Sequence, residues 1–242
     1  MNRTKIETCD LTTNPVSGCD HACWYCYAKR GYERFHRSFK PTFHPDRLTE
    51  IGHMKGPMEA DNARRKPWIA KAFPRTWLTF VCSVSDLFAP WTLEPWRDAV
   101  LEKIREPSED DVVFQLLTKC PAGIPDDSTF HRNVWLGVTV TCQDEVSLLY
   151  DLVGSGVDIP SEGKFFASFE PLLGPIVLSD DVLESLDWMI IGKLTGSRRV
   201  KLEREWVDHL IECAEIVDVP VFVKNSVIKE LGPKYQIREF PE

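Results

Sequence analysis

The chain has 242 residues, of which 43% are hydrophobic, enough to bury the core of one large α/β domain or of two small ones. No apolar run approaches the ~20 residues that cross a bilayer, and the polar segment Met1 to Asp10 lacks the apolar core of a signal peptide. The sequence therefore predicts a cytoplasmic protein without a membrane partner. In that reducing compartment, clustered cysteines favour metal binding or catalysis over disulfides.

The formal charge of −8 argues against a protein coated in basic surface for nucleic acid, but the charge is unevenly distributed. Residues 29–75 carry twelve basic and five acidic side chains, so this segment is strongly positive on an acidic protein. Such a region can steer an anionic partner. The alternative is a solvated, charged connecting segment.

Short apolar runs alternate along the chain with helical patterns. The predicted strands are Leu78–Val84, Val112–Leu117, Val134–Val140, Phe165–Phe169, Trp188–Ile191 and Val219–Val223, with a weaker candidate within Lys5–Thr12. The predicted helices are Tyr27–Phe35, Leu93–Arg105, Gln143–Val153, Asp180–Leu186 and Glu203–Val217. This alternation predicts βαβ units and a parallel sheet.

The fold class is therefore α/β. Six or seven units fit a complete or partial (β/α) barrel of the TIM-barrel type, and a doubly wound sheet is the alternative, because strand order cannot be read from one sequence. Residues 41–76 interrupt the alternation with five prolines and are expected to form a long, mostly irregular basic insertion. We expect one domain spanning residues 1–242.

The most informative segment runs from residue 13 to 28 and contains Cys19, Cys23 and Cys26 at the spacing C-x3-C-x2-C. Three thiolates in one short loop before a helix can bind three of the four irons of a 4Fe–4S cluster and leave the fourth iron open for an external ligand. Trp24 and Tyr25 can shield such a cluster from water.

Two other interpretations of the triplet remain open. A structural zinc ion needs four ligands, so Cys9 or His21 would have to complete the set. A redox disulfide between Cys23 and Cys26 would leave Cys19 without a role.

The segment C-D-H-A-C-W-Y-C, with an aromatic residue before the last cysteine, resembles the cysteine motif of the radical S-adenosylmethionine superfamily. That resemblance implies a partial (β/α)6 barrel and a cluster whose open iron chelates S-adenosylmethionine. It also implies an external electron donor and reductive cleavage to a 5′-deoxyadenosyl radical. Many radical enzymes carry Gly-Gly-Glu after the second strand for the cofactor's amino group, whereas this chain has Ser83-Val-Ser85-Asp86 there.

Within that superfamily, the chain most closely resembles a phage-associated protein family of unknown function, found in bacteria, archaea and their viruses. The resemblance covers nearly the whole chain. It is carried by six segments, residues 14–19, 80–88, 114–119, 133–138, 169–175 and 220–225.

Independently of the resemblance, the carboxyl ends of the predicted strands carry polar residues, which is where (β/α) barrels place their chemistry. These residues are Ser85, Asp86, Thr118, Lys119, Thr141, Gln143, Glu170, Lys193, Lys224 and Asn225, and we expect them to converge on one pocket. Asp86 and Glu170 could instead cap helices or pair with lysines, and Lys119 and Lys193 could simply be solvated. A lysine ending the last buried strand needs a partner, and Glu170 or a substrate anion would suit Lys224.

The predicted enzyme therefore has three sets of residues. Cys19, Cys23 and Cys26 hold the cluster; Tyr25, Ser83, Ser85, Asp86, Thr139 and Asn225 contact the cofactor; Lys119, Glu170 and Lys224 face the reacting groups. The basic segment and the phage association favour a nucleotide or nucleic acid as substrate. The alternative is a non-catalytic zinc or iron–sulfur module that binds nucleic acid through residues 29–75.

Overall fold

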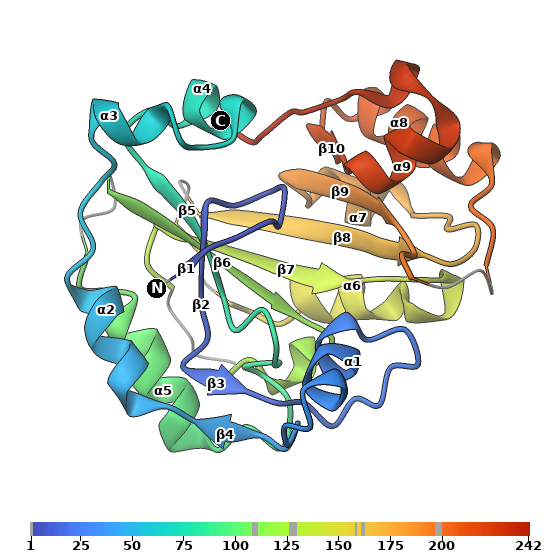
Figure 1. Ribbon diagram of the computed structural model, residues 1–242. Helices are drawn as coiled ribbons and strands as arrows, with labels where there is room; N and C mark the ends of the chain where they lie inside the picture. Colours follow the sequence, from blue (N-terminus) through green and yellow to red (C-terminus); the bar gives the residue numbers. More distant parts are fainter. Residues whose placement is uncertain (1, 108–110, 126–129, 158, 161–162, 197–199) are drawn as a thin grey trace.

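A computed structural model describes residues 2–107, 111–125, 130–157, 159–160, 163–196 and 200–242 (Figure 1). The strands are β1 (Asn2–Arg3), β2 (Leu11–Thr13), β3 (Val16–Ser17), β4 (Thr42–Phe43), β5 (Trp77–Val81), β6 (Val112–Thr118), β7 (Val134–Thr139), β8 (Lys164–Leu172), β9 (Trp188–Lys193) and β10 (Val221–Val223). The helices are α1 (Tyr27–Arg34), α2 (Thr49–Gly52), α3 (Glu59–Asn62), α4 (Pro67–Ala72), α5 (Glu94–Lys103), α6 (Ser147–Val153), α7 (Asp180–Glu184), α8 (Arg204–Ile216) and α9 (Asn225–Leu231).

An eight-stranded sheet in the order β1-β2-β5-β6-β7-β8-β9-β10 forms the centre of the molecule. The short β1 is antiparallel to β2, and every other pairing in this sheet is parallel. Neighbouring strands follow one another along the chain without a reversal, which excludes the doubly wound alternative. The sheet is mostly parallel and is not closed into a complete ring by strand pairing.

The sequence predicts the regular elements of this sheet well. Each of the six stronger strand candidates coincides with one of β5 to β10, and the weak candidate corresponds to β2 at Leu11–Thr13. Each predicted helix overlaps an observed one, and the stretch predicted as Gln143–Val153 begins with a 3-10 turn before α6. The sequence analysis missed α9, the short β1 and the small antiparallel sheet of β3 and β4.

One face of the sheet packs against the helices that connect its strands. Side chains at alternate positions, such as Leu136, Ala167, Met189 and Val221, share a single apolar core with α5, α6, α7 and α8. This period of two is what a strand requires when one of its faces is covered by helices.

The opposite face carries a second core, built largely of aromatic rings. Trp188 is fully buried at its centre, with Trp135 and Phe166 at 5.6 and 5.7 Å between ring centroids. Phe222 and Phe240 complete this aromatic layer around Trp188. Farther along the same face, towards the carboxyl ends of the strands, the layer gives way to the cavity described below.

Residues 41–76 differ from the expected irregular basic insertion. They contain a 3-10 turn and the short helices α2, α3 and α4, and Ile69 of α4 is fully buried in the aromatic core. Arg65 is also buried, where its guanidinium bonds both carboxylate oxygens of Asp10. The basic segment runs from α1 at the lower right of Figure 1 to α4 at the top, so its charges do not form one surface.

Side-chain contacts connect the segments next to the first and the last strand of the sheet. The Glu7 carboxylate, between β1 and β2, accepts a hydrogen bond from the Arg238 guanidinium at 3.0 Å and another from the Asn225 backbone N–H. The guanidinium of Arg238 also lies 4.9 Å from the centroid of the Trp68 ring in α4. We call this group of contacts the Glu7 clasp.

No helix within the described residues is both long enough and apolar enough to cross a membrane.

Candidate functional site

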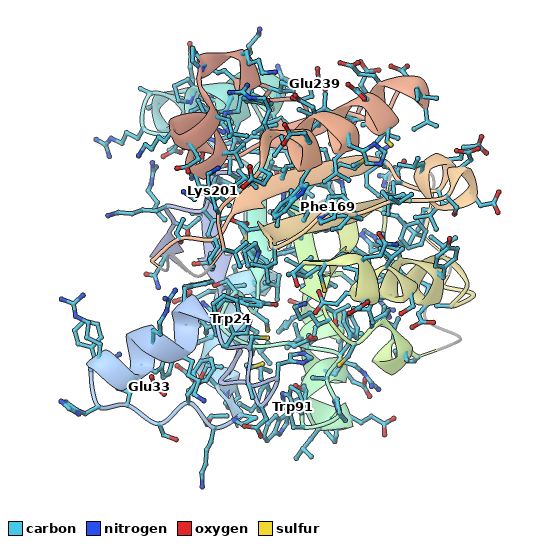
Figure 2. The ribbon with its side chains drawn as sticks, turned by 90° about the vertical axis from the view of Figure 1, so that its right-hand side faces the viewer. Trp24, Glu33, Trp91, Phe169, Lys201 and Glu239 are labelled. Carbon is cyan, nitrogen blue, oxygen red and sulfur yellow. The ribbon has the colours of Figure 1, made fainter. Side chains whose placement is uncertain are left out.

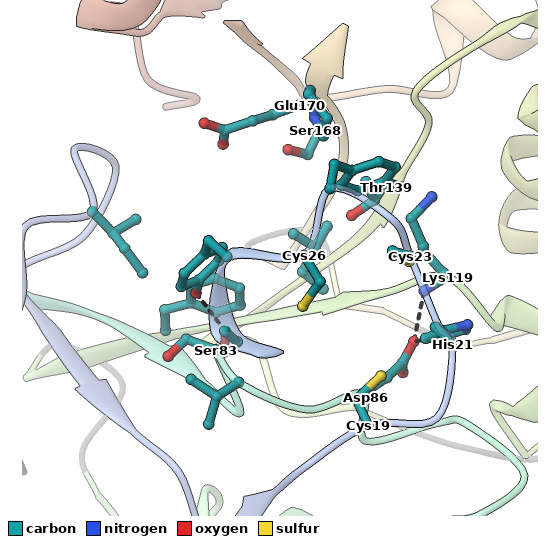
Figure 3. Close-up of a pocket in the computed structure, with 18 of the residues that line it drawn as sticks. Cys19, His21, Cys23, Cys26, Ser83, Asp86, Lys119, Thr139, Ser168 and Glu170 are labelled. Carbon is teal, nitrogen blue, oxygen red and sulfur yellow. Dashed lines mark hydrogen bonds and ion pairs between the residues drawn. The ribbon is translucent and has the colours of Figure 1, made fainter. Parts of the chain in front are cut away.

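A cavity of about 590 Å³ opens at the carboxyl ends of the parallel strands (Figure 3). Its lining comes from the cysteine loop, from the ends of β5 to β10 and from the start of α1. Of the strand-end residues expected to converge, the following line it: Ser85, Asp86, Thr118, Lys119, Glu170, Lys193 and Lys224. Convergence at one pocket is therefore confirmed for most of the set.

The cysteine loop connects β3 to α1 and needs two residues in the left-handed backbone region. Gly18 has φ +84°, and a Cβ there would lie 2.2 Å from the carbonyl oxygen of Lys40, so only glycine fits. Ala22, between the first two cysteines, has φ 54°. The Cys26 thiol caps α1 by accepting a hydrogen bond from the Lys29 N–H. These turns direct Cys19, Cys23 and Cys26 to the same cavity.

The three thiols line the cavity without forming a tight cluster. Among the described residues, the one group of three ligand atoms lying within 4.8 Å of one another is His21, Asp86 and Cys120. Ligands of a single tetrahedral zinc ion lie about 3.8 Å apart, given Zn–S bonds of about 2.3 Å. Cys19, Cys23 and Cys26 therefore do not have the spacing of a closed zinc site.

Burial and charge both affect the thiol of Cys19. Burial first, and then the nearby charges of Asp86, Cys23 and Cys26, raise the pKa of Cys19 to about 12. Ionisation of this thiol is therefore unfavourable unless a positive charge lies next to it.

Of the two expected candidates for a fourth zinc ligand, Cys9 lies outside the cavity and His21 lines it but is bonded to Asp86. Cys9 is fully buried in the aromatic core and does not line the cavity. The imidazole Nε2 of His21 lies 2.8 Å from Asp86 Oδ2, and it is 3.9 Å from the Cys120 thiol.

Asp86 connects the cysteine loop to two strands. Besides His21, its carboxylate accepts hydrogen bonds from the Thr118 hydroxyl at 2.7 Å and from the Lys119 backbone N–H at 2.8 Å. A third bond comes from the Phe88 backbone N–H, and the residue is only 4% exposed. Both oxygens are thus engaged by the protein, so Asp86 holds the loop in place at the cavity and has little capacity left for a cofactor.

The serines next to Asp86 are also engaged. The Ser83 hydroxyl donates to the Asn14 side chain at 3.1 Å, and the Ser85 hydroxyl donates to the Val16 carbonyl at 2.8 Å. The Ser83 carbonyl accepts a hydrogen bond from the Tyr27 hydroxyl. Ser83, Ser85, Asp86 and Thr118 form what we call the β5–β6 wall, whose polar groups bind the chain segment that carries the cysteines.

The opposite side, here called the β7–β9 wall, consists of Thr139, Ser168 and Glu170, with Gly192 of β9 next to the Glu170 carboxylate. No hydrogen bond to the hydroxyl of Thr139 or Ser168 is found within the described residues, and both side chains line the cavity. A Cβ on Gly192 would lie 2.7 Å from the Glu170 carboxyl carbon. A glycine at this position of β9 therefore leaves the room that the carboxylate occupies. Figure 3 shows Cys23 and Cys26 between the two walls.

Three lysines at the cavity have acidic partners. Lys224 forms a close ion pair with Glu170, as its position at the end of a buried strand requires. Lys119 contacts both oxygens of Glu145 at 2.9 Å, and Lys193 pairs with Glu230 at 2.7 Å. Of the three acids, Glu170 alone lines the cavity, so the Glu170–Lys224 pair presents both charges to a ligand.

Some expected site residues lie elsewhere. Asn225 does not line the cavity: its side chain accepts a hydrogen bond from Arg238, because successive residues at a strand end point to opposite sides. Thr141 and Gln143 are also outside the cavity, bonded to Glu145 and to the backbone of Val177. Tyr25 does line it, with its ring against Trp24 at 5.5 Å.

The sequence analysis missed several residues that line the cavity, including Lys5, Glu7, Arg30, Ser168 and Ser226. Ser168 could have been found, because it precedes Glu170 by two residues and so lies on the same face of β8. It also missed the role of His21 as the partner of Asp86.

Comparison with known proteins gives a family for this chain. The model of the family described as "Protein of unknown function (DUF5131)" matches residues 3–231, and the chain belongs to that family. No curated protein and no solved structure matches it.

Proposed function

We propose that this member of the DUF5131 family is a radical S-adenosylmethionine enzyme, with a 4Fe–4S cluster held by Cys19, Cys23 and Cys26. The observation that carries the proposal is that three thiols from one loop line a single cavity at the carboxyl edge of a parallel sheet. The strand order, parallel and without reversal, supports our interpretation of the sheet as an incomplete barrel.

The donor set fits a cluster better than a single metal ion. In a cubane, each of three irons takes its own thiolate, so the thiols must lie farther apart than ligands that share one ion. Among the described residues the three cysteines do not form a group within 4.8 Å, which supports separate irons over one shared ion. When bound, such a cluster supplies the electron that cleaves S-adenosylmethionine to methionine and a 5′-deoxyadenosyl radical.

The residues of the chain have separate tasks in this proposal. Asp86, through His21, fixes the loop that presents the thiols. The Glu170 carboxylate and the Lys224 ammonium offer opposite charges to the amino and carboxylate groups of the methionine moiety. The apolar side chains of Phe80 and Leu117 line the same cavity and exclude water from the reacting centre.

The test uses protein purified without oxygen, reconstituted with iron and sulfide, reduced and mixed with S-adenosylmethionine. We expect about four irons per chain, a paramagnetic resonance signal that changes on adding the cofactor, and release of 5′-deoxyadenosine. Replacement of Cys213, which lies in α8 away from the cavity, by alanine is the matched control and should leave all three readouts unchanged. A colourless protein with one tightly bound zinc and no cleavage product would overturn the proposal.

A further inference from the structure

The surface around α1 is unusual for this acidic protein. We call it the α1 surface and define it by exposed aromatic and basic residues: Trp24, Tyr27, Phe35, Lys29, Arg30, Arg34, Arg37 and Lys40. Glu33 is the one acidic residue between positions 24 and 40. On a chain with a formal charge of −8, this surface is therefore a local positive region.

Three aromatic side chains of the α1 surface are largely exposed to solvent. Trp24 is 47% exposed, Tyr27 60% and Phe35 67%. Only Ala28 of α1 is buried, so the helix contributes little to the core and presents most of its circumference to solvent. Figure 2 shows α1 projecting from the body of the molecule, with Glu33 towards its outer end. Exposed aromatic rings grouped on one element mark an interaction surface.

The cations of this surface are available to a ligand. Within the described residues, no ion pair engages Lys29, Arg34 or Arg37. The guanidinium groups of Arg34 and Arg37 instead lie 5.9 and 6.0 Å from the centroid of the Phe35 ring. The positive charges and the ring faces are therefore interleaved.

The α1 surface continues into the candidate active site. Cys26, Tyr27, Ala28 and Arg30 all line the cavity. The guanidinium of Arg30 donates hydrogen bonds to the carbonyls of Thr195 and Gly196, which links α1 to the loop after β9 across the cavity rim. A ligand lying along α1 would therefore pass the mouth of the cavity.

We infer that the α1 surface binds a single-stranded nucleic acid and brings one of its nucleotides to the cavity as the substrate. Phosphates pair with Lys29, Arg34 and Arg37, while unpaired bases stack on the exposed rings. A duplex fits less well, because its bases already stack on one another and hide their faces from aromatic side chains. The role of the nucleotide as substrate rests on the proposed function, whereas binding does not depend on it.

The first test measures fluorescence anisotropy with labelled 20-nucleotide strands, DNA and RNA of the same sequence, and with the DNA duplex. We expect tighter binding of a single strand than of the duplex. The comparison of DNA with RNA shows whether the surface prefers deoxyribose or ribose. Neutralisation of three cations in K29Q/R34Q/R37Q should weaken binding by about 100-fold near 0.1 M salt and flatten its salt dependence. The control K55Q/K71Q/R75Q removes three exposed charges from the same basic segment away from α1 and should bind normally.

The second test separates stacking from charge. Phe35→Ala should weaken single-strand binding by roughly tenfold and leave binding of inorganic polyphosphate unchanged. If polyphosphate and duplex bind as tightly as the single strands and Phe35→Ala has no effect, the surface recognises charge alone, as for an acidic protein partner, and the inference is overturned. Equal loss in K55Q/K71Q/R75Q would also overturn it.

These measurements need neither reductant nor S-adenosylmethionine, so the two proposals can fail separately. Single-strand binding without cofactor cleavage would contradict the proposed function and support the assignment of the α1 surface as a binding surface. Cofactor cleavage without single-strand binding would remove only this inference.

Discussion

The two walls of the cavity carry similar polar residues but use them differently. On the β5–β6 wall, Ser83, Ser85 and Asp86 are bonded to the segment that carries the cysteines. On the β7–β9 wall, Ser168 and Glu170 face the cavity. The first wall positions the cysteine loop, and the second leaves its polar groups facing the cavity. Residues of the same type, at equivalent ends of neighbouring strands, therefore have different tasks according to their partners.

The largest expected effect lies in the loop between the walls. Replacing Cys19, Cys23 or Cys26 singly by alanine should abolish formation of 5′-deoxyadenosine, because three of the four irons of the proposed cluster each depend on one of these thiolates. The measurement is product formed per reconstituted chain, with Cys213→Ala alongside. A single variant of Cys19, Cys23 or Cys26 that still forms 5′-deoxyadenosine would contradict the cluster assignment.

The second effect concerns the β5–β6 wall. Asp86→Asn keeps the shape of the side chain but loses the charge and one acceptor, so the free energy of unfolding should fall by about 2 kcal/mol. Because His21 loses its charged partner, iron content after reconstitution should fall as well. Urea unfolding and iron analysis check both; unchanged iron content with a normal cluster spectrum would remove the positioning role of Asp86.

The third effect concerns the β7–β9 wall. Glu170→Gln should weaken S-adenosylmethionine binding by roughly tenfold, since one charged contact contributes about 1.5 kcal/mol. Iron content should stay at the level of the unaltered protein, unlike in Asp86→Asn. Equilibrium binding of the cofactor to the reconstituted protein gives the result, and a drop in iron content instead would show that the two walls act alike.

The smallest effects compare single hydroxyls across the cavity. Ser85→Ala removes a bond to the Val16 carbonyl and should cost about 1 kcal/mol of stability with cofactor affinity within twofold. Ser168→Ala should leave stability nearly unchanged and weaken cofactor binding two- to fivefold, on the order of 0.5–1 kcal/mol. Thermal unfolding and cofactor titration of both variants give the comparison, and reversed effects would interchange the roles of the walls.

The sequence predicts the elements of this fold better than it predicts the use of their polar residues. Short, nearly continuous apolar runs locate β5 to β10, and most of the polar residues at the carboxyl ends of these strands do converge on one cavity. The same pattern cannot tell Asp86 from Glu170, because the distinction depends on Thr118 and His21, which are distant in sequence. The structure of residues 41–76 could not be predicted either. The prolines in this segment favour a loop, whereas α4 packs into the aromatic core.

The Glu7 clasp has a consequence for how the protein is made. Its two charged partners, Glu7 and Arg238, are separated by 231 positions in the chain, so this contact is strongly non-local. During synthesis from the amino terminus, Glu7 can contact Arg238 only after 231 further residues have been added. The cysteine loop is synthesised early, whereas Lys224 and Arg238 are synthesised late, so the Glu170–Lys224 pair and the Glu7 clasp can form only after β5 to β10 have been made.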